Sequence, residues 1–566
     1  MMRRWALLGL GLLGLAGARV EAEAKDVWLH AQTEHFDVYA ATGEREAAEI
    51  VGDLELFRSA VVDELGESMG NRARVRIVLW DREWDFEAFK PIPPEEDADP
   101  LDEDGLWKRY ERELRWRTVG AGNPNRTMST LRTLVGPPRL QRKIGWVGHG
   151  VDGGNQDLDV RYGADEDVSW IALSGERRWE HTARAMRWPY VKLHLDQQRK
   201  PLPLWYEDGV AAILREFRVV GDDYALGSWS SSRGSFLVAM RQLTAWPDFF
   251  QQSAGDEVFE LPGARYAYAS QAWLLLQHAR FNRKDDTRLA EALQAALDDP
   301  RLKGGDVGDR VFAQAEIAPE ELTEALEKLL RRQRSREVYR RLGAKVELDF
   351  RVMAETEVET LLEDMKVRLR RDPETVAALR ERLEANAQDR RALSLLGLYA
   401  LDEAELGAAE TYWERAVLAG SEVSAHLRLA PQLAVEGRWH VLEFGDWTEA
   451  DAARLPEWRM RLRSILATDP TDESAIEVLA WVEALAADVD AENVALVEGR
   501  LAGMGWSDLT EVALLHLQLR READNAEARA KLEAYAHYAD ELLATVAGEL
   551  WQMHQNKTPA EVAGVE

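Results

Sequence analysis

The chain has 566 residues, of which 46% are hydrophobic and 30% are charged, and it contains no cysteine. Its length predicts two or three hydrophobic cores rather than one, and its composition is that of a globular protein. The formal net charge of −30 argues against nucleic acid or an anionic membrane as a partner, because both require a basic surface. Without cysteine the chain has no disulfide, no thiolate metal site and no thiol nucleophile.

Residues 1–24 have the pattern of a secretory signal peptide. A pair of arginines begins the segment, an apolar run over residues 5–16 follows, and small residues allow cleavage after Ala18 or Ala24. The apolar run is shorter than the ~20 residues that span a bilayer, and no later stretch is long enough. We therefore expect a periplasmic or secreted protein without stable membrane insertion. An uncleaved N-terminal anchor is the alternative.

The first part of the chain after this segment alternates between strand and helix patterns. Residues 35–40 and 74–80 predict strands, because they are rich in β-branched and aromatic residues. Residues 44–66 carry apolar side chains at helical spacing, and residues 81–89 predict a second helix. Residues 91–105 are dense in proline and acid, which is typical of a solvated insertion.

The pattern becomes mainly helical further along. Residues 168–173 predict another strand, and residues 175–197 predict a helix that is disturbed at Pro189. Residues 264–281 predict a strongly apolar helix. Residues 307–333 predict two helices, the second of which begins with a proline and ends with basic residues that suit the helix dipole.

These patterns predict an α+β domain over residues 25–335, followed by an all-α domain. Strand patterns nearly vanish after residue 335, so we expect a linker over residues 336–355. Helical periodicity then continues over residues 356–554, and residues 555–566 are expected to form a flexible tail.

Residues 392–420 have the spacing of a tetratricopeptide-like repeat. Small and bulky residues recur at the positions where two antiparallel helices pack closely, with Gly397 and Ala409 twelve residues apart. The residues at this spacing are Leu393, Leu396, Gly397, Ala409, Trp413 and Ala416. Neighbouring units are less regular, so the pattern predicts two to four repeats. Stacked repeats present extended surfaces, which favours a protein or peptide partner.

Two short segments resemble a known family. The segment "LPLWYEDG" (202–209) and the later "YAYASQAWLLLQHAR" (266–280), in this order of elements, resemble secreted bacterial peptidase-MA-like proteins of the gluzincin type, which often end in tetratricopeptide repeats. The resemblance implies a gluzincin-like fold for residues 25–335. It also implies a zinc site built from a His-Glu-x-x-His helix and a glutamate on the next helix, with the first glutamate as general base.

The residues that the resemblance assigns to this chemistry have been replaced. Trp188 stands at the first histidine, Pro189 at the general base and Lys192 at the second histidine, while Asp208, beside Glu207, stands at the third ligand. An indole is only a hydrogen-bond donor, and a lysine brings a positive charge to the place of a cation. We therefore expect no zinc site, no cofactor and no catalytic residue of the family type.

A metal site rebuilt from other residues is an alternative. Glu180, His181 and His194 flank the replaced segment, but the two histidines are 13 residues apart, which is about 20 Å along an uninterrupted helix. His149 is isolated. Residues 152–159 carry alternating carboxylates but lack the spacing of an EF-hand loop, so we expect a surface loop there rather than a calcium site.

Other motifs do not point to a reaction. The chain has no Gly-x-Ser-x-Gly elbow, no phosphate-binding loop and no dinucleotide fingerprint. Its 21 tryptophans are expected to pack between helices, and aromatic platforms for a peptide or glycan are the alternative.

The sequence thus favours an exported, non-catalytic pseudo-metallopeptidase that binds a protein or peptide through its helical repeats. One alternative is an active hydrolase that uses unconventional ligands or a metal-free site near Glu207 and Asp208. A structural envelope protein without a specific ligand is a third possibility.

Overall fold

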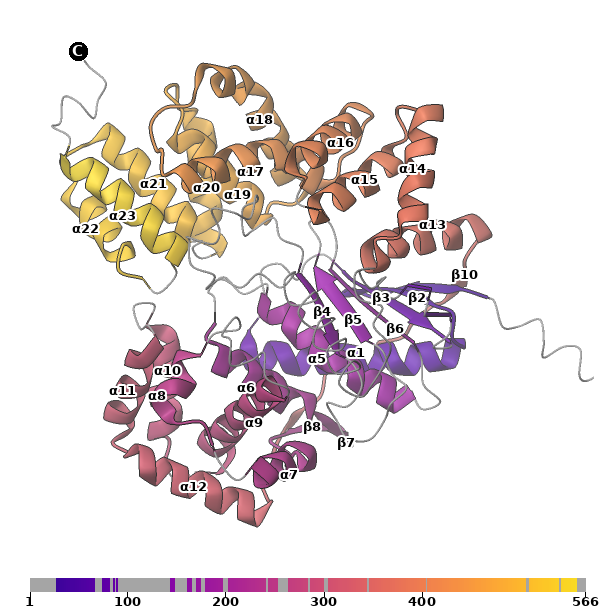
Figure 1. The fold of residues 1–566 in the computed structure, drawn as a ribbon, viewed down its shortest axis with the longest axis vertical. Helices are drawn as coiled ribbons and strands as arrows, with labels where there is room; N and C mark the ends of the chain where they lie inside the picture. The colour runs from indigo at the N-terminus through magenta and orange to yellow at the C-terminus, as the bar shows by residue number, and fades with distance from the viewer. Residues whose placement is uncertain are drawn as a thin grey trace, which may run out of the picture.

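The computed structural model describes 17 stretches of the chain. They are residues 27–66, 74–81, 85–86, 88–89, 143–147, 160–164, 169–174, 179–196, 202–240, 243–252, 263–282, 286–299, 304–343, 346–403, 405–504, 508–538 and 541–556. The expected signal peptide, the acidic loop at 91–105, His149 and residues 152–159 lie outside them. The described residues form an α+β protein that is mostly helical, with two sheets (Figure 1).

The elements follow the chain in this order. The strands are β1 (Leu29–Gln32), β2 (Phe36–Ala40), β3 (Val75–Trp80), β4 (Lys143–Val147), β5 (Val160–Ala164), β6 (Ser169–Ser174), β7 (Arg218–Val220), β8 (Asp223–Leu226), β9 (Val338–Arg341) and β10 (Arg351–Val352). The helices before residue 335 are α1 (Glu44–Leu65), α5 (Trp179–Asp196), α6 (Leu204–Arg215), α7 (Ser231–Met240), α8 (Trp246–Gln251), α9 (Ala264–Gln277), α10 (Arg288–Asp298), α11 (Gly304–Ala315) and α12 (Pro319–Arg332). The later helices are α13 (Glu355–Met365), α14 (Pro373–Ala385), α15 (Arg390–Asp402), α16 (Leu406–Leu418), α17 (Ser424–Val441), α18 (Glu449–Thr468), α19 (Glu473–Ala484), α20 (Ala491–Met504), α21 (Asp508–Arg521), α22 (Ala526–Tyr535) and α23 (Glu541–Asn556). Helices α9 and α13 continue into π-helical turns, η4 (His278–Asn282) and η5 (Lys366–Arg370).

The larger sheet has seven strands in the order β10-β1-β2-β3-β6-β5-β4. Its central strands β2, β3 and β6 are parallel to one another, and the outer pairs are antiparallel. In Figure 1 helices α1 and α5 lie along one face of this sheet, while α13 lies near β10. The second sheet contains the antiparallel strands β7, β8 and β9.

The central position of strand β3 in the larger sheet explains the apolar run at residues 77–80. Ile77 and Leu79 point into the large core that includes α1 and α5, whereas Val78 and Trp80 point into a smaller core on the other face. This smaller core is completed by residues of α13 such as Met365. Because both faces of the strand are buried, apolar side chains occupy successive positions instead of alternating with polar ones.

The segment at 336–355 was expected to be a linker, but it contains two short strands, β9 and β10, one in each sheet. Strand β9 pairs with β8, and β10 pairs with β1 at the edge of the larger sheet. Both strands are short and mostly exposed, so their sequences give little local signal, and their extended conformation depends on pairing with strands far away in the sequence. Met353 then enters the core beneath α13, which ties the C-terminal helices to the sheet.

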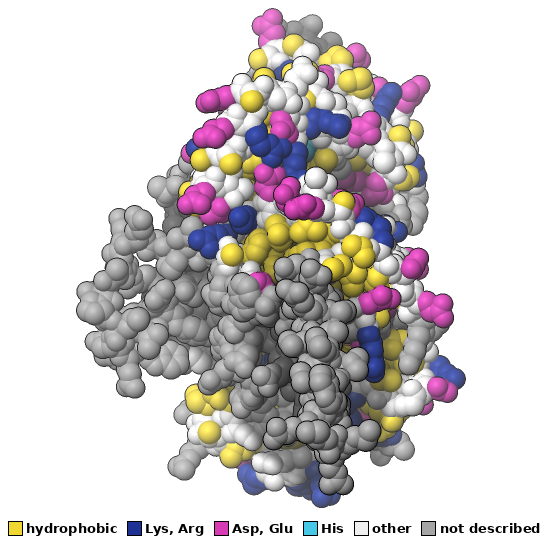
Figure 2. All heavy atoms as spheres, turned by 90° about the vertical axis from the view of Figure 1, so that its right-hand side faces the viewer, with side chains coloured by type: hydrophobic (Ala, Val, Ile, Leu, Met, Phe, Trp, Pro, Cys, Tyr) yellow, Lys and Arg dark blue, Asp and Glu magenta, His cyan; other side chains and the backbone are white. Residues whose placement is uncertain are grey.

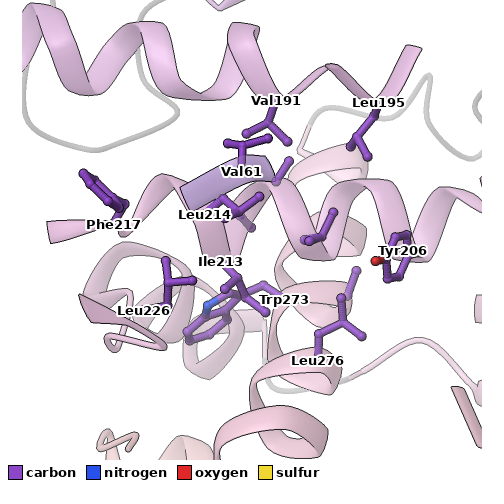
Figure 3. Close-up of a cluster of buried hydrophobic side chains, with 14 of the residues drawn as sticks. Val61, Val191, Leu195, Tyr206, Ile213, Leu214, Phe217, Leu226, Trp273 and Leu276 are labelled. Carbon is purple, nitrogen blue, oxygen red and sulfur yellow. The ribbon is translucent and has the colours of Figure 1, made fainter. Parts of the chain in front are cut away.

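Helices α1, α5, α6 and α9 meet in one hydrophobic cluster with strand β8. Figure 3 shows Val61, Val191, Leu214 and Trp273 among the side chains that fill it. Gly209 sets the closeness of α6 and α9, since a Cβ atom at this position would lie 2.7 Å from Leu276 Cδ1 and 2.9 Å from the backbone oxygen of Ala272. The glycine that ends the "LPLWYEDG" segment is therefore required by packing.

The helices from α14 to α23 pack largely onto their neighbours in sequence and form an arc over the rest of the molecule (Figure 1). Several of them begin at a residue whose side chain accepts a hydrogen bond from the backbone N–H three positions later. These N-caps include Asp372, Asp389, Thr448, Asp472 and Asn525. Asp and Asn are preferred there because each satisfies one of the unpaired N–H groups of the first turn.

The molecular surface carries both signs of charge. On the face shown in Figure 2 acidic and basic side chains are interspersed, and hydrophobic side chains gather near the middle of the view. No helix in the described part of the chain has an apolar stretch long enough to cross a lipid bilayer.

Candidate functional site

The residues that the resemblance assigns to the positions of a zinc site lie on two consecutive helices. Trp188, Pro189 and Lys192 lie on α5, and Glu207 and Asp208 lie in the first turns of α6. Helix α5 runs from Trp179 to Asp196 without interruption, although we expected a disturbance at the proline. Proline has no N–H to donate, so one intrahelical hydrogen bond is missing there, but the helix continues beyond it.

Lys192 faces the two acids of α6. Its Nζ atom donates a hydrogen bond of 2.8 Å to Glu207 Oε2 and lies 3.9 Å from Asp208 Oδ1. The lysine and glutamate side chains are 15% and 21% exposed, and that of Asp208 is only 1% exposed. The positions that the resemblance assigns to the second and third zinc ligands are therefore close in space, and they hold an ion pair.

Asp208 has a second cationic neighbour on α9. Arg265 Nη2 lies 3.1 Å from Oδ1 and 3.0 Å from Oδ2 of this carboxylate. A buried carboxylate is costly unless it is paired, and here two cations neutralise it. Lys192 and Arg265 thus provide positive charge beside the acids of α6 from two different helices.

Trp188 contributes to a stack of aromatic rings around a third cation. The guanidinium of Arg233, on α7, lies 5.7 Å from the ring centroid of Trp188 and 5.1 Å from that of Tyr266. Arg233 is only 3% exposed. An aromatic face attracts a cation within about 6 Å, so Trp188, which the resemblance aligns with a histidine, has a packing role here.

A fourth cation, Arg215, lies at the end of α6. The pKa of its guanidinium is lowered to about 10, chiefly by burial and also by the neighbouring Arg233, while Glu216 and Tyr266 act in the opposite direction. Burial also lowers the pKa of Arg233, while Tyr266, Asp208 and Glu216 raise it. We call Lys192, Arg215, Arg233 and Arg265 the cation cluster.

His194, another candidate from the sequence, makes a different contact. His194 is buried on α5, and its Nε2 lies 3.1 Å from the backbone oxygen of Gly66. The side chains of Glu180 and His181 lie outside the described part of the chain. Among the described residues no group of three or more His, Asp or Glu side chains is arranged to hold a metal ion.

Three members of the cation cluster were not identified from the sequence. Arg215, Arg233 and Arg265 lie on helices α6, α7 and α9, and an arginine in a helix ordinarily belongs to a solvated face. One signal was present: Arg215 follows Asp208 by seven residues, two helical turns later, so both side chains share one face of α6.

Comparison with known proteins does not extend this description. No family model, no curated protein and no solved structure matches the chain.

Proposed function

We propose that the chain is an exported, non-catalytic relative of gluzincin-type peptidases that binds a protein or peptide through its C-terminal helices. The observation that carries the proposal is the ion pair between Lys192 and Glu207, with Asp208 beside it. A lysine ammonium close to these acids provides the positive charge that a zinc ion would otherwise bring. The pair of Lys192 and Glu207 therefore supports the proposal that a structural contact stands where the family has a metal site.

The packing of α5 on α6 supports the gluzincin-like part of the proposal. Lys192 Nζ and Asp208 Oδ1 are 3.9 Å apart although the residues are 16 positions apart in the sequence, so the two ligand positions converge as the resemblance requires. Trp205 and Gly209, which belong to the segment that carries the resemblance, serve the core and the α6–α9 contact.

A hydrolase with Glu207 or Asp208 as general base is less well supported. Asp208 is 1% exposed and both of its oxygens lie near Arg265, so it does not face the solvent from which a water nucleophile would come. Glu207 accepts a hydrogen bond from Lys192. Changing both acids to alanine in a peptide-cleavage assay tests this alternative directly.

The binding part of the proposal rests on the late helices. A pocket of about 430 Å³ lies between α21 and α22. Its lining mixes charged, amide and apolar groups, which suits the backbone and side chains of a peptide: Leu515, Gln518, Arg521, Glu522, Asn525, Glu527, Ala528 and Lys531.

A photocrosslinking experiment tests the binding surface. A photoreactive amino acid at Gln518 should crosslink a discrete protein or peptide in cells, whereas the same group at Arg45, which is 91% exposed on α1, should not. Crosslinking that is equal at the two positions, or absent from both, contradicts binding at the late helices.

A restored metal site tests the family part separately. The variant that combines Trp188→His, Pro189→Glu, Lys192→His and Asp208→Glu should bind about one zinc per chain, as measured by elemental mass spectrometry. The unchanged chain, purified without chelators or a histidine tag, should bind none. Zinc bound to the unchanged chain would favour the alternative of an active hydrolase. A restored variant that folds but binds no zinc would contradict the gluzincin-like placement of α5 and α6.

A further inference from the structure

The end of α12 and strand β9 carry a concentration of positive charge in an otherwise acidic chain. Residues 328–341, which we call the basic segment, contain seven Lys and Arg residues and a single acid, Glu337. The seven cations are all exposed: Lys328, Arg331, Arg332, Arg334, Arg336, Arg340 and Arg341. The basic segment is therefore a local positive surface on a protein whose formal net charge is −30.

Acids of the same chain neutralise only part of this charge. Three of the cations form the pairs Arg331–Glu327, Arg340–Glu64 and Arg341–Asp222, at 3.4, 2.9 and 3.4 Å. In the part of the chain that the structure describes, no acidic oxygen lies within 4.0 Å of the other four. The helix dipole explains basic residues in the last turn of α12, but Arg334 and Arg336 lie beyond the end of the helix.

Strand β9, within the basic segment, lies at an edge of the smaller sheet. It pairs with β8, and among the described residues no strand lies on its other side. An edge strand presents alternate N–H and C=O groups that no neighbouring strand satisfies. Tyr339 and Arg341, which share one face of the strand, are 54% and 75% exposed. The basic segment thus combines unpaired cations with backbone groups that can pair with an extended chain.

We infer that the basic segment binds an extended acidic segment of a partner protein, which adds a strand at the free edge of β9. Main-chain hydrogen bonds to a sheet edge provide affinity in this mode of recognition, and side chains provide specificity. Six of the seven cations are arginines, whose planar forks match the two oxygens of a carboxylate. The exposed ring of Tyr339 offers an apolar contact between these charges.

Phosphate groups also match guanidinium groups, so an anionic membrane is the competing partner. A lipid headgroup has no backbone to pair with β9, however, so it would use only half of the recognition surface. The net charge of −30 also opposes approach to an extended anionic surface, whereas a short acidic segment is affected mainly by charges within a Debye length, about 8–10 Å. Both considerations favour a protein segment.

The basic segment is separate from the pocket of the proposed function. In Figure 1 helix α12 lies at the lower end of the molecule, and α21 and α22, which line that pocket, lie in the upper part. The inference therefore goes beyond the proposed function and does not depend on binding by the late helices.

Fluorescence anisotropy with the purified full chain and three labelled peptides tests the inference. A peptide of four Glu-Thr repeats should bind, and its affinity should fall at least about tenfold when the salt concentration rises from about 20 to about 200 mM. A peptide of four Gln-Thr repeats should not bind. A peptide of four Glu-Pro repeats keeps the carboxylates but lacks half of the N–H donors, so it should bind at least about fivefold more weakly than the first.

Two triple variants with the same net charge locate the site. The variant that combines Arg332→Gln, Arg334→Gln and Arg336→Gln should bind the Glu-Thr peptide at least about tenfold more weakly than the unchanged chain. The matched control removes exposed arginines from α1, α11 and α14 and should bind normally: Arg45→Gln, Arg310→Gln and Arg380→Gln. Circular dichroism checks that both variants are folded, and the comparison of peptides on the unchanged chain does not depend on either variant.

Four results would overturn the inference. Equal binding of the Glu-Thr and Gln-Thr peptides would remove charge from the recognition, and equal binding of the Glu-Pro peptide would remove strand addition. Equal losses in the two triple variants would show that the net charge matters rather than the basic segment. Vesicles of phosphatidylglycerol and phosphatidylcholine should not bind the chain, and binding to them that is lost in the first triple variant would assign the basic segment to a membrane.

Discussion

Gly397 on α15 lies directly against the indole ring of Trp413 on α16. A Cβ atom at residue 397 would stand 2.1 Å from both Cδ1 and Nε1 of the ring. The Trp413 Nε1 in turn donates a hydrogen bond of 3.0 Å to the backbone oxygen of Ser394, one turn earlier on α15. The absence of a side chain at 397 thus lets the tryptophan reach the backbone of the facing helix.

The first prediction concerns this contact. Gly397→Ala should lower the free energy of unfolding by about 2 kcal/mol, because the added methyl group must displace the indole or separate the helices. Urea unfolding followed by tryptophan fluorescence measures the change. Gly407→Ala, on α16 with no atom within 4 Å of the added Cβ, is the control and should be neutral or slightly stabilising. Equal effects of the two substitutions would contradict the close approach.

The second prediction concerns the pair of Lys192 and Glu207. Lys192→Met keeps the approximate length of the side chain but removes its positive charge. The negative charges of the partly buried Glu207 and the buried Asp208 then have one cation fewer beside them. We expect a loss of about 2 kcal/mol in the free energy of unfolding. Lys328→Met, at an exposed lysine of α12, should change it by less than about 0.5 kcal/mol.

The double variant of this pair gives an independent measurement. If Lys192 acts mainly through Glu207, then Lys192→Met combined with Glu207→Gln should cost less than the sum of the single changes, with a coupling of about 1 kcal/mol. Strict additivity would show that the two residues stabilise the fold separately.

The third prediction concerns a buried acid among the late helices. Glu483 on α19 is 1% exposed, accepts bonds of 2.8 and 2.7 Å from Arg459 on α18, and accepts further bonds from the backbone of Asp490 and the amide of Asn493. Glu483→Gln leaves the arginine without its charge partner, so we expect a loss of about 3 kcal/mol or more in urea unfolding.

An exposed pair is the control for Glu483. Arg45 and Glu49 form an i, i+4 pair on α1 in which the arginine is 91% exposed. Glu49→Gln should cost less than about 0.5 kcal/mol, because water screens such a pair. A comparable loss for the two glutamates would show that burial does not decide the strength of these contacts.

The fourth prediction concerns pH. Arg351 and the backbone N–H of Ala354 hydrogen-bond to Glu357, in the first turn of α13, and lower its pKa to about 2. Because the folded-state pKa lies below the ordinary value of 4.5, the stabilisation is fully present above pH 4.5 and is lost as the pH falls toward 2.

Urea midpoints between pH 7 and pH 2 measure this effect. Glu357→Gln should be less stable than the unchanged chain at pH 7, and the difference should shrink as the pH falls below 4.5. Glu374→Gln, in the first turn of α14, removes an acid from an equivalent place and is the control. A difference that stays constant with pH would contradict the role of the carboxylate.

Local patterns in the sequence predicted many of the elements. The apolar spacing predicted α1, α9 and α12, and the runs rich in β-branched residues predicted β2, β3 and β6, because these segments bury side chains at the period of their own secondary structure. The distance from Gly397 to Ala409 likewise anticipated the packing of α15 on α16. Strands β9 and β10 were missed because they are short and exposed, so only their pairing partners make them strands.

The candidate site likewise has features that the sequence shows and features that only the folded chain shows. The sequence by itself determined that Trp188, Pro189 and Lys192 replace the residues the resemblance requires, since this depends on residue type and position along the chain. Only the tertiary structure decided that Lys192 meets the acids of α6, and that Arg233 is buried beside them. Such contacts depend on how α5, α6, α7 and α9 cross, and a crossing is fixed by packing between distant segments rather than by the sequence of any one helix.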